Sequence, residues 1–413
     1  MTGVPELLAP AGDWSALRAA VANGADAVYF GLEGFNARRR AANFTRDTLG
    51  EVVDWLHDHN VRGYVTLNTL AFSAELPAVA EYIAAIAAAG ADAVIVQDLG
   101  VARLARALAP TLAVHASTQM TQTEPEGIAA LGALGVSRVI VARELSLDEL
   151  RTIRAATDMP LEVFVHGALC LSYSGQCLAS EALFGRSANR GECAQVCRLP
   201  FDLVVDGVVR DDPQRRHVLS PRDLAAVERV GDLAALGVAA LKIEGRLKSA
   251  AYVAAATRVY RAALDAAAEG RSAALTDEQR VELAQGFTRG FSRGYLDGVN
   301  HAGLVDGRSP KARGLHIGNV HAVDRGGVTI TPVAGTAAVA LKPGDGVVFA
   351  DERADGREQG GRVYGVTPAA RPRGAVVATF GRDDVALGAI RAGSAVWKTD
   401  DPVVRQRLEA TYS

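Results

Sequence analysis

Apolar and polar positions follow one repeating order through the first three hundred residues: a short apolar run, one or two polar residues, then an amphipathic stretch rich in Ala and Leu. Eight of the apolar runs predict β-strands, at Glu6–Ala11, Asp26–Gly31, Arg62–Asn68, Asp92–Asp98, Leu112–Thr118, Arg138–Glu144, Leu161–Gly167 and Ala240–Gly245. Apolar strands that alternate with helices indicate a parallel sheet covered by helices, and eight such units close a (β/α)8 TIM barrel. We therefore expect an α/β fold with this barrel in residues 1–300. A doubly wound open sheet is the alternative, because periodicity does not give strand order.

The connection between the seventh and eighth runs is much longer than the others. We expect its excess, about residues 168–200, to form an elaborated loop at the carboxyl end of the seventh strand. Helix signals stand on both sides of the eighth run. Ser249–Gly270 begins with a capping serine and ends with a glycine, and Ser220 and Pro221 suit the N-cap and first position of another helix.

A second, smaller domain is predicted for residues 301–413. Gly298–Gly314 is rich in glycine and poor in apolar residues, which is typical of a linker. Six short alternating runs follow: LHIGNVHAV, GVTITPV, DGVVFA, GRVYGV, GAVVATF and SAVWKTD. Alternation with a period of two, interrupted by turn residues, indicates a small all-β barrel or sandwich.

All four cysteines lie in the segment His166–Arg198, with the spacing C-x6-C-x15-C-x3-C. Cys170, Cys177, Cys193 and Cys197 can supply four thiolates, which zinc and iron-sulfur clusters both accept. Structural zinc sites usually contain two close cysteine pairs, and here only the second pair is close, so the spacing favours a [4Fe-4S] cluster over zinc. Inert core thiols are less favoured because the segment is polar. If all four cysteines bind one cluster, it would transfer electrons or shape the loop.

Polar residues follow six of the predicted strands. The carboxyl ends of barrel strands meet on one face, where the active sites of TIM barrels form. From this position we take His166, His115 and Glu244 as candidate catalytic residues, the histidines for proton transfer.

The same face contains candidates for binding an anion. Arg246 and Lys248 follow the eighth strand, where a guanidinium can grip a carboxylate in bidentate fashion and an ammonium adds a point charge. Arg143, Asn68 and Gln97 are further candidates for binding the substrate or donor, although Arg143 could equally pair with Glu144.

Composition limits the class of protein. With 49% hydrophobic residues and a net charge of -3, the chain is globular and not strongly basic. The start MTGVPELLAPAGDW does not resemble a leader, and no stretch approaches the roughly 18 apolar residues of a membrane span. We expect a cytoplasmic protein without membrane contact, in which clustered cysteines are ligands or redox groups.

Hydrolase motifs are weak. Gly290–Gly294 matches G-x-S-x-G, but that elbow follows a strand and the preceding residues resemble a helix end, so Ser292 is not favoured as a nucleophile. A thiol protease using Cys170 or Cys177 with His166 is an alternative, although it would not need further cysteines.

One stretch suits single-stranded RNA. Thr288–Gly298 interleaves arginines with Phe291 and Tyr295, and basic residues follow at Arg308, Lys311 and Arg313. Arginine can pair with phosphate and aromatic rings can stack on bases. A solvated linker explains the pattern equally well.

Several segments together resemble the collagenase-like peptidase family U32: ELLAPAGDW with ANGADAVYFG, EVFVHGALCLSYSGQC, RSANRGECAQVCR, LKIEGRLKS and FTRGFSRGYLDG. The resemblance covers nearly the whole chain, and the cysteine segment is its most specific part. It implies oxygen-independent hydroxylation, of RNA bases in one branch and of ubiquinone precursors in another. VTLNT, AVIVQD, VHASTQ and GRSANRGECAQVCRLP are most similar to the branch that makes 5-hydroxycytidine in 23S rRNA, and a branch acting on tRNA uridine shares the cysteine spacing.

The resemblance also implies cofactors and partners. The four cysteines become ligands of a [4Fe-4S] cluster, and prephenate becomes the hydroxyl donor, whose two carboxylates suit Arg246 and Lys248. The expected partners are rRNA or tRNA, the small anionic co-substrate and an electron donor. The LKPGDGVVF turn resembles the barrels of translation factors, so the small domain is expected to help hold RNA. The alternatives are a peptidase with a structural metal, a hydroxylase of a small molecule and a non-catalytic scaffold.

Overall fold

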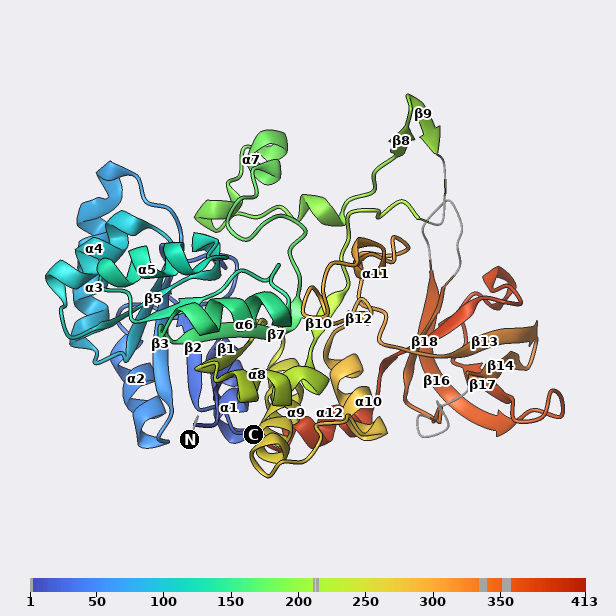
Figure 1. Ribbon diagram of the computed structural model, residues 1–413. Coiled ribbons are helices and arrows are strands. Elements are labelled where there is room, and N and C mark those ends of the chain that lie inside the picture. Colours follow the sequence, from blue (N-terminus) through green and yellow to red (C-terminus); the bar gives the residue numbers. More distant parts are fainter. Residues whose placement is uncertain (1–2, 211, 213–214, 334–339, 351–357) are drawn as a thin grey trace.

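A closed parallel barrel forms the larger part of the molecule (Figure 1). The computed structural model describes residues 3–413 except 211, 213–214, 334–339 and 351–357. The barrel strands within these residues are β1 Glu6–Ala11, β2 Ala27–Gly31, β3 Arg62–Leu67, β4 Ala93–Val96, β5 Ala113–Ala116, β6 Arg138–Ile140, β7 Leu161–Ala168 and β11 Ala240–Ile243. Parallel pairing of β11 with both β1 and β7 closes the barrel, which confirms the TIM-barrel prediction and excludes the open sheet.

Helices surround the barrel, as the amphipathic stretches predict (Figure 1). They are α1 Trp14–Ala22, α2 Leu49–Asp58, α3 Leu76–Ala88, α4 Leu99–Leu108, α5 Pro125–Ala133, α6 Leu147–Ala156, α8 Val230–Leu236 and α9 Ala250–Ala268. Their starts follow capping chemistry, because the Asp13 carboxylate accepts the Ala16 amide at 2.8 Å and Ser146 forms a capping box with Glu149. Ser249 caps α9 as predicted.

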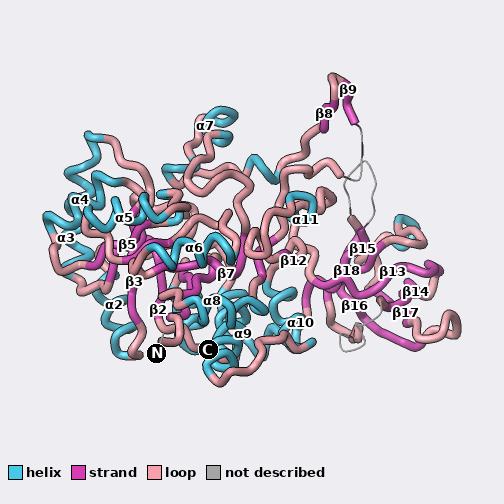
Figure 2. The backbone as a smooth tube through the Cα atoms, viewed as in Figure 1, coloured by secondary structure: helices cyan, strands magenta, loops and turns pink. Residues whose placement is uncertain are grey.

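The long connection after β7 is mostly loop, and Figure 2 shows it rising above the barrel together with α7 Ala179–Phe184. It continues into the hairpin of β8 Leu203–Val205 and β9 Val208–Arg210, and then into β10 Asp223–Ala225. β10 pairs antiparallel with the end of β7, and β12 Phe291–Ser292 pairs with β10.

The prediction of a helix that begins at Ser220 and Pro221 is therefore wrong. Tertiary contacts override the local signal: the Arg198 guanidinium donates to Ser220 Oγ at 2.8 Å and to the Pro221 carbonyl, and Leu224 pairs with Gly167 of β7. The helix α8 begins only at Val230.

The six alternating runs of the C-terminal part form the expected strands. These are β13 Leu315–Asp324, β14 Gly327–Pro332, β15 Gly346–Ala350, β16 Gln359–Pro368, β17 Val376–Phe380 and β18 Ala395–Asp400. They close an antiparallel barrel, which decides between barrel and sandwich. Lys398 and Asp345 form a buried ion pair of 2.7 Å inside it.

Helices connect the two barrels and end the chain. α10 Asp277–Gly286 and α11 His301–Leu304 precede the second barrel, and α12 Pro402–Glu409 follows it. α12 packs against α9 and α10, and Arg407 pairs with Glu282 of α10 at 2.6 Å. The last helix thus returns to the first barrel. None of the helices in the described residues is long and apolar enough to cross a membrane.

Candidate active site

The cysteine segment lies directly on the carboxyl ends of the barrel strands. Glu144, after β6, accepts hydrogen bonds from the amide of Ser174 at 3.1 Å and from its hydroxyl. Gly175 has a φ of +77°, and a side chain there would collide with the backbone carbonyl of Gln119 after β5. The Asn189 carbonyl accepts the amide of Leu70, after β3, at 3.1 Å. These contacts place the segment over the mouth of the barrel.

The four thiols stand close enough to influence one another. All are free, with Cys170 and Cys193 exposed and Cys177 and Cys197 half-buried. Burial of its thiol end raises the pKa of Cys170, and its thiolate neighbours raise it further. Burial likewise raises the pKa of Cys197, with contributions from the other three cysteines. The Gln195 amide donates to Cys193 Sγ at 3.3 Å, the kind of bond that tunes cluster sulfurs.

The four thiols are the candidate ligands of a metal centre at the mouth. Among the described residues, no three His, Cys, Asp or Glu side chains form a group that could hold one metal ion. Cysteine thiolates ligate zinc as well as iron-sulfur clusters.

Below this segment, three guanidiniums surround one carboxylate; we call Arg38, Arg143, Arg246 and Glu244 the mouth cluster. Glu244 accepts from Arg38 at 3.2 Å and from Arg143 at 3.4 Å. Burial alone would raise the pKa of Glu244, but Arg38, Arg143 and Arg246 outweigh it and lower the pKa to about 2. Burial lowers the pKa of Arg246 to about 10. The carboxylate is therefore ionised, and one negative charge faces three positive ones.

Neutral polar groups line the same mouth. Arg246 donates to Thr66 Oγ1 at 2.9 Å and to Asn36 Oδ1 at 3.2 Å. The Asn68 amide donates to Gln119 Oε1 at 3.1 Å. Gln97 is buried, and its Oε1 has no hydrogen-bond partner within the described residues. A buried acceptor without a donor is costly, so Gln97 marks a position where a ligand could donate.

Lys248 does not join Arg246, although the two residues are only two positions apart. Its ammonium lies 2.9 Å from the centre of the Phe287 ring, and Arg289 lies over the same ring at 4.7 Å. Arg289 pairs with Asp223 at 2.7 Å. Together with Arg198, which adjoins Cys197, these residues form the outer cluster: Lys248, Arg198, Arg289 and Asp223. Arg246 and Lys248 therefore have different partners in the structure, Thr66 and Asn36 for Arg246 and the Phe287 ring for Lys248.

The two histidines differ from the expected arrangement. His115 lies inside the barrel at the level of Arg138, the first residue of β6, with its ring 5.0 Å from that of Tyr64, and so lies away from the mouth. His166 is enclosed by the rings of Tyr252, Tyr260 and Phe291 at 5.4 to 5.8 Å.

Burial lowers the pKa of both His115 and His166 to about 3. Both imidazoles are neutral at neutral pH, far from the pKa near 7 that proton transfer favours.

The opposite pole of the barrel holds buried charges that pair closely; Glu6, Arg62, Arg138, Glu162 and Lys242 form the N-terminal cluster. Lys242 bonds to Glu162 at 2.8 Å, and Arg138 bridges Glu6 at 3.0 Å and Glu162 at 3.4 Å. A depression of about 710 Å³ opens there, lined by Glu6, Arg62 and Arg138 among others. In TIM barrels the residues at this pole usually stabilise the fold and do not take part in catalysis.

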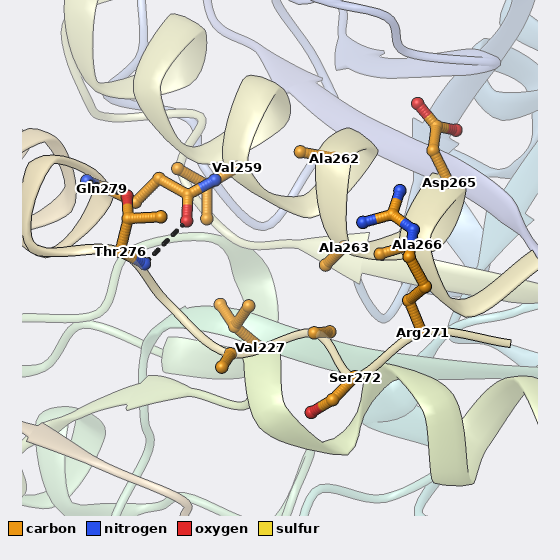
Figure 3. A pocket seen from close by; sticks show the side chains of 12 residues that line it. Val227, Val259, Ala262, Ala263, Asp265, Ala266, Arg271, Ser272, Thr276 and Gln279 are labelled. Carbon is orange, nitrogen blue, oxygen red and sulfur yellow. Dashed lines mark hydrogen bonds between the residues drawn. The ribbon is translucent and has the colours of Figure 1, made fainter. Parts of the chain in front are cut away.

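A second hollow, of about 390 Å³, lies between α9 and the turn into α10 (Figure 3). The hydrogen bond drawn there joins the Thr276 amide to Gln279 and belongs to the cap of α10. Its lining is largely alanine and valine, with Asp265 and Arg271 as the charged residues. Neither hollow lies at the mouth.

The arginine-aromatic stretch is mostly engaged within the fold. Arg293 pairs with Glu228 and, at 2.9 Å, with Asp297, while Phe291 packs against His166. Ser292 lies in the two-residue strand β12, without the strand-to-helix turn of a nucleophile elbow.

Sequence reasoning missed three arginines at this face. Arg38 belongs to the basic run Arg38–Arg40 in the loop after β2, and Arg198 directly follows the last cysteine. Arg289 is part of the arginine-aromatic stretch Thr288–Gly298, and the sequence pattern does not distinguish it from the other arginines there. A basic run on a loop at the carboxyl end of a strand was the signal available for Arg38.

Comparison with known proteins identifies relatives along most of the chain. The model of peptidase family U32 matches residues 12–306. The 23S rRNA 5-hydroxycytidine C2501 synthase of Escherichia coli is 41% identical over 328 residues, 76% of this chain. The chain spans 48% of that relative's length.

Two further relatives carry different names. An uncharacterised protease of Methanocaldococcus jannaschii is 38% identical over 76% of this chain and 80% of its own length. The tRNA hydroxylation protein P1 of Bacillus subtilis is 34% identical over 72% of each chain.

Proposed function

The chain belongs to peptidase family U32, and we propose that it is an enzyme that hydroxylates a pyrimidine base of RNA without oxygen. The observation that carries this proposal is the cysteine segment fastened over a barrel mouth with an excess of positive charge. The names of the relatives from E. coli and B. subtilis, one an rRNA hydroxycytidine synthase and the other a tRNA hydroxylation protein, support RNA as the substrate.

The cysteines provide the cofactor site in this proposal. Cys170, Cys177, Cys193 and Cys197 hold a [4Fe-4S] cluster, which when bound supplies one-electron transfer. Burial raises the pKa of Cys170 and of Cys197, and the positive charges of Arg143 and Arg198 offset part of this effect. Glu144 holds the loop through Ser174, so the thiols stay over the mouth.

The mouth cluster binds the hydroxyl donor, a small dicarboxylate such as prephenate. Arg143 and Arg38 can each donate two hydrogen bonds to a carboxylate of the dicarboxylate. Before the dicarboxylate binds, the negative charge of Glu244 reduces the repulsion between the two guanidiniums. Arg246 is held by Thr66 and Asn36 and adds positive charge below. Gln97 Oε1 accepts a hydrogen bond from the donor's hydroxyl or from the base.

The atoms and electrons of the exchange balance. Replacing C5–H of the base by C5–OH removes two electrons from the base, and conversion of the donor's C–OH to C–H takes them up. Neutral His115 and His166 do not transfer the proton at neutral pH, since their pKa values are near 3.

The test compares nucleosides of rRNA and tRNA by mass spectrometry in three strains: one lacking the protein, one rescued with it, and one rescued with Cys193→Ala. A hydroxypyrimidine should disappear in the first and third and return in the second. An unchanged profile in all three would refute RNA hydroxylation and leave the small-molecule hydroxylase.

Peptidase activity is the second candidate, supported by the family's name and by the M. jannaschii relative. The site disfavours it, because His166, the candidate base for a cysteine nucleophile, is enclosed by aromatic rings and burial lowers its pKa to about 3. Cleavage of casein or gelatin by the purified protein, lost in Cys170→Ala but kept in Cys193→Ala, would favour the peptidase.

A further inference from the structure

The outer cluster holds more positive charge than its surroundings balance. Lys248, Arg198 and Arg289 are all partly or largely buried, and within the described part of the chain Asp223 is the one carboxylate bonded to any of them. Charged groups are rarely buried without partners, because desolvation is costly. The imbalance therefore indicates a site for an anion that does not belong to this chain.

Of the residues in the outer cluster, Lys248 has the fewest polar partners for its charge. Among the described residues, no oxygen lies within hydrogen-bonding or ion-pair distance of its ammonium, which rests on the ring of Phe287. Burial, and then the charge of Arg289, lower the pKa of Lys248 to about 8. Both effects penalise the charged form, and an incoming anion would relieve both.

Arg198 and Arg289 frame this position. Among the described residues, Arg198 donates to neutral oxygens only, those of Ser220, Pro221 and Leu169, so none of them is a bonded counterion of its charge. Arg289 donates one hydrogen bond from Nη1 to the Asp223 carboxylate and another from Nε to the Pro310 carbonyl at 2.9 Å.

We propose that the outer cluster binds a backbone phosphate of single-stranded RNA, with Lys248 as its principal contact. This inference rests on the proposed function and assigns the substrate's backbone to a surface separate from the mouth cluster. Lysine binds phosphate as a point charge, and the neighbouring guanidiniums add directed donors. The adjacent cysteine segment then lies beside the nucleotide attached to that phosphate.

The path continues from the outer cluster onto the second barrel. The Arg313 amide donates to the Thr288 carbonyl at 3.2 Å, next to Arg289. The Arg313 guanidinium pairs with Glu358 and lies 6.0 Å from the ring of Trp397, so the aromatic rings are the main binding element here. The rings of Trp397 and His316 are 5.0 Å apart on neighbouring strands.

Three nitrogens of this group, Arg313 Nε, His316 Nε2 and Trp397 Nε1, are buried and have no hydrogen-bond partner among the residues that the structure describes. Alternating cations and rings are what single-stranded nucleic acid binds, through phosphate pairing and base stacking. Unsatisfied nitrogens also make this arrangement costly in the free protein, so a ligand that reaches them gains affinity.

The experiment measures binding of a fluorescein-labelled single-stranded RNA, of about 20 nucleotides, to the purified full-length protein by anisotropy over a series of KCl concentrations. Lys248→Met keeps the aliphatic contact with Phe287 and removes the charge. It should weaken binding about three- to tenfold at low salt and make the salt slope shallower by about 0.7. Lys248→Arg should restore both.

Arg103→Met is the matched control. Arg103 is exposed on α4, which packs on β4 and β5 across the barrel from β11, and its loss changes the net charge equally. It should leave affinity and slope unchanged. Trp397→Ala should weaken binding at least about fivefold through lost stacking, with little change in slope.

The outcomes separate this inference from the proposed function. Equal binding by Lys248→Met and the wild type, with hydroxylation intact in cells, would overturn the phosphate site and leave hydroxylation standing. Lysine-dependent RNA binding without any hydroxypyrimidine in cells would support the site and refute hydroxylation. If Lys248→Met instead abolished thermal stabilisation by prephenate and spared RNA binding, the outer cluster would belong to the small anion and the inference would fail. Equal losses in Arg103→Met would also overturn it.

Discussion

The two poles of the barrel both hold buried charges, but they balance them differently. In the N-terminal cluster two largely buried cations, Arg138 and Lys242, face two buried carboxylates at 2.8 to 3.4 Å, and the third cation, Arg62, is exposed. At the carboxyl ends, the mouth and outer clusters each set three cations against one carboxylate, so among these described residues six positive charges face two negative ones. A balanced network stabilises the fold, whereas an unbalanced one is completed by a ligand.

The largest effect is expected from breaking the balanced pole. Lys242→Met leaves the fully buried Glu162 with Arg138 alone and should lower the free energy of unfolding by about 3–5 kcal/mol. Urea unfolding followed by circular dichroism measures it. RNA affinity of the folded variant should not change.

The double variant Lys242→Met with Glu162→Gln should recover much of that loss, since the uncompensated charge is gone. A loss below about 1 kcal/mol in the single variant would show that the network is not stabilising.

The next effect concerns the unbalanced pole. Prephenate at a hundredfold excess over its Kd should raise the free energy of unfolding by about 2.7 kcal/mol. Arg143→Met, which keeps the contact with the Phe164 ring, should remove most of this increase because Glu244 then faces fewer cations and the donor loses a bidentate partner. Stabilisation equal to wild type would place the small anion elsewhere. Lys242→Met is the contrasting control, since it should lose stability but keep the increase.

A third effect follows from pH. The pKa of His115 in the fold, about 3, lies below its ordinary value of 6.5, so the unfolded chain binds the proton first. The stability contributed by neutral His115 is present above pH 6.5 and is lost as pH falls toward 3. Between pH 6.5 and 4.5 the loss should amount to about 2 kcal/mol. His115→Gln should remove this part of the pH dependence, measured by urea unfolding at several pH values.

His321→Gln, at an exposed position of β13, is the control and should leave the pH dependence as it is. If His115→Gln left it unchanged as well, His115 would not be a neutral buried group in the fold.

The barrels could be predicted from the sequence because their signals are local. Each strand is a short apolar or alternating run, and caps such as Ser249 act within one turn. The prediction of a helix at Pro221 was wrong because this backbone bonds instead to the distant guanidinium of Arg198 and continues into the strand that pairs with β7. Local propensity is a weak prior against such contacts.

The site was predictable only in part for the same reason. The cysteines share one segment, so their grouping is visible in the sequence. The partners of Glu244 are not, because Arg38 lies about two hundred positions away and meets it only through barrel closure. Arg246 and Lys248, neighbours in the sequence, diverge where the chain turns from β11 into α9, and this sends them to separate clusters.

The smallest expected effect tests how the cysteine segment is held over the unbalanced pole. Glu144→Gln keeps an acceptor for Ser174 but removes the charge, and hydrogen bonds to charged groups are worth about 1 kcal/mol more than neutral ones. Because the segment contacts the barrel at several other points, the loss should be local: faster amide hydrogen exchange around Ser174, with the global free energy of unfolding within about 0.5 kcal/mol of wild type. A global loss as large as that of Lys242→Met would mean that the loop is part of the barrel's stability, and the two poles would then differ in charge balance but not in role.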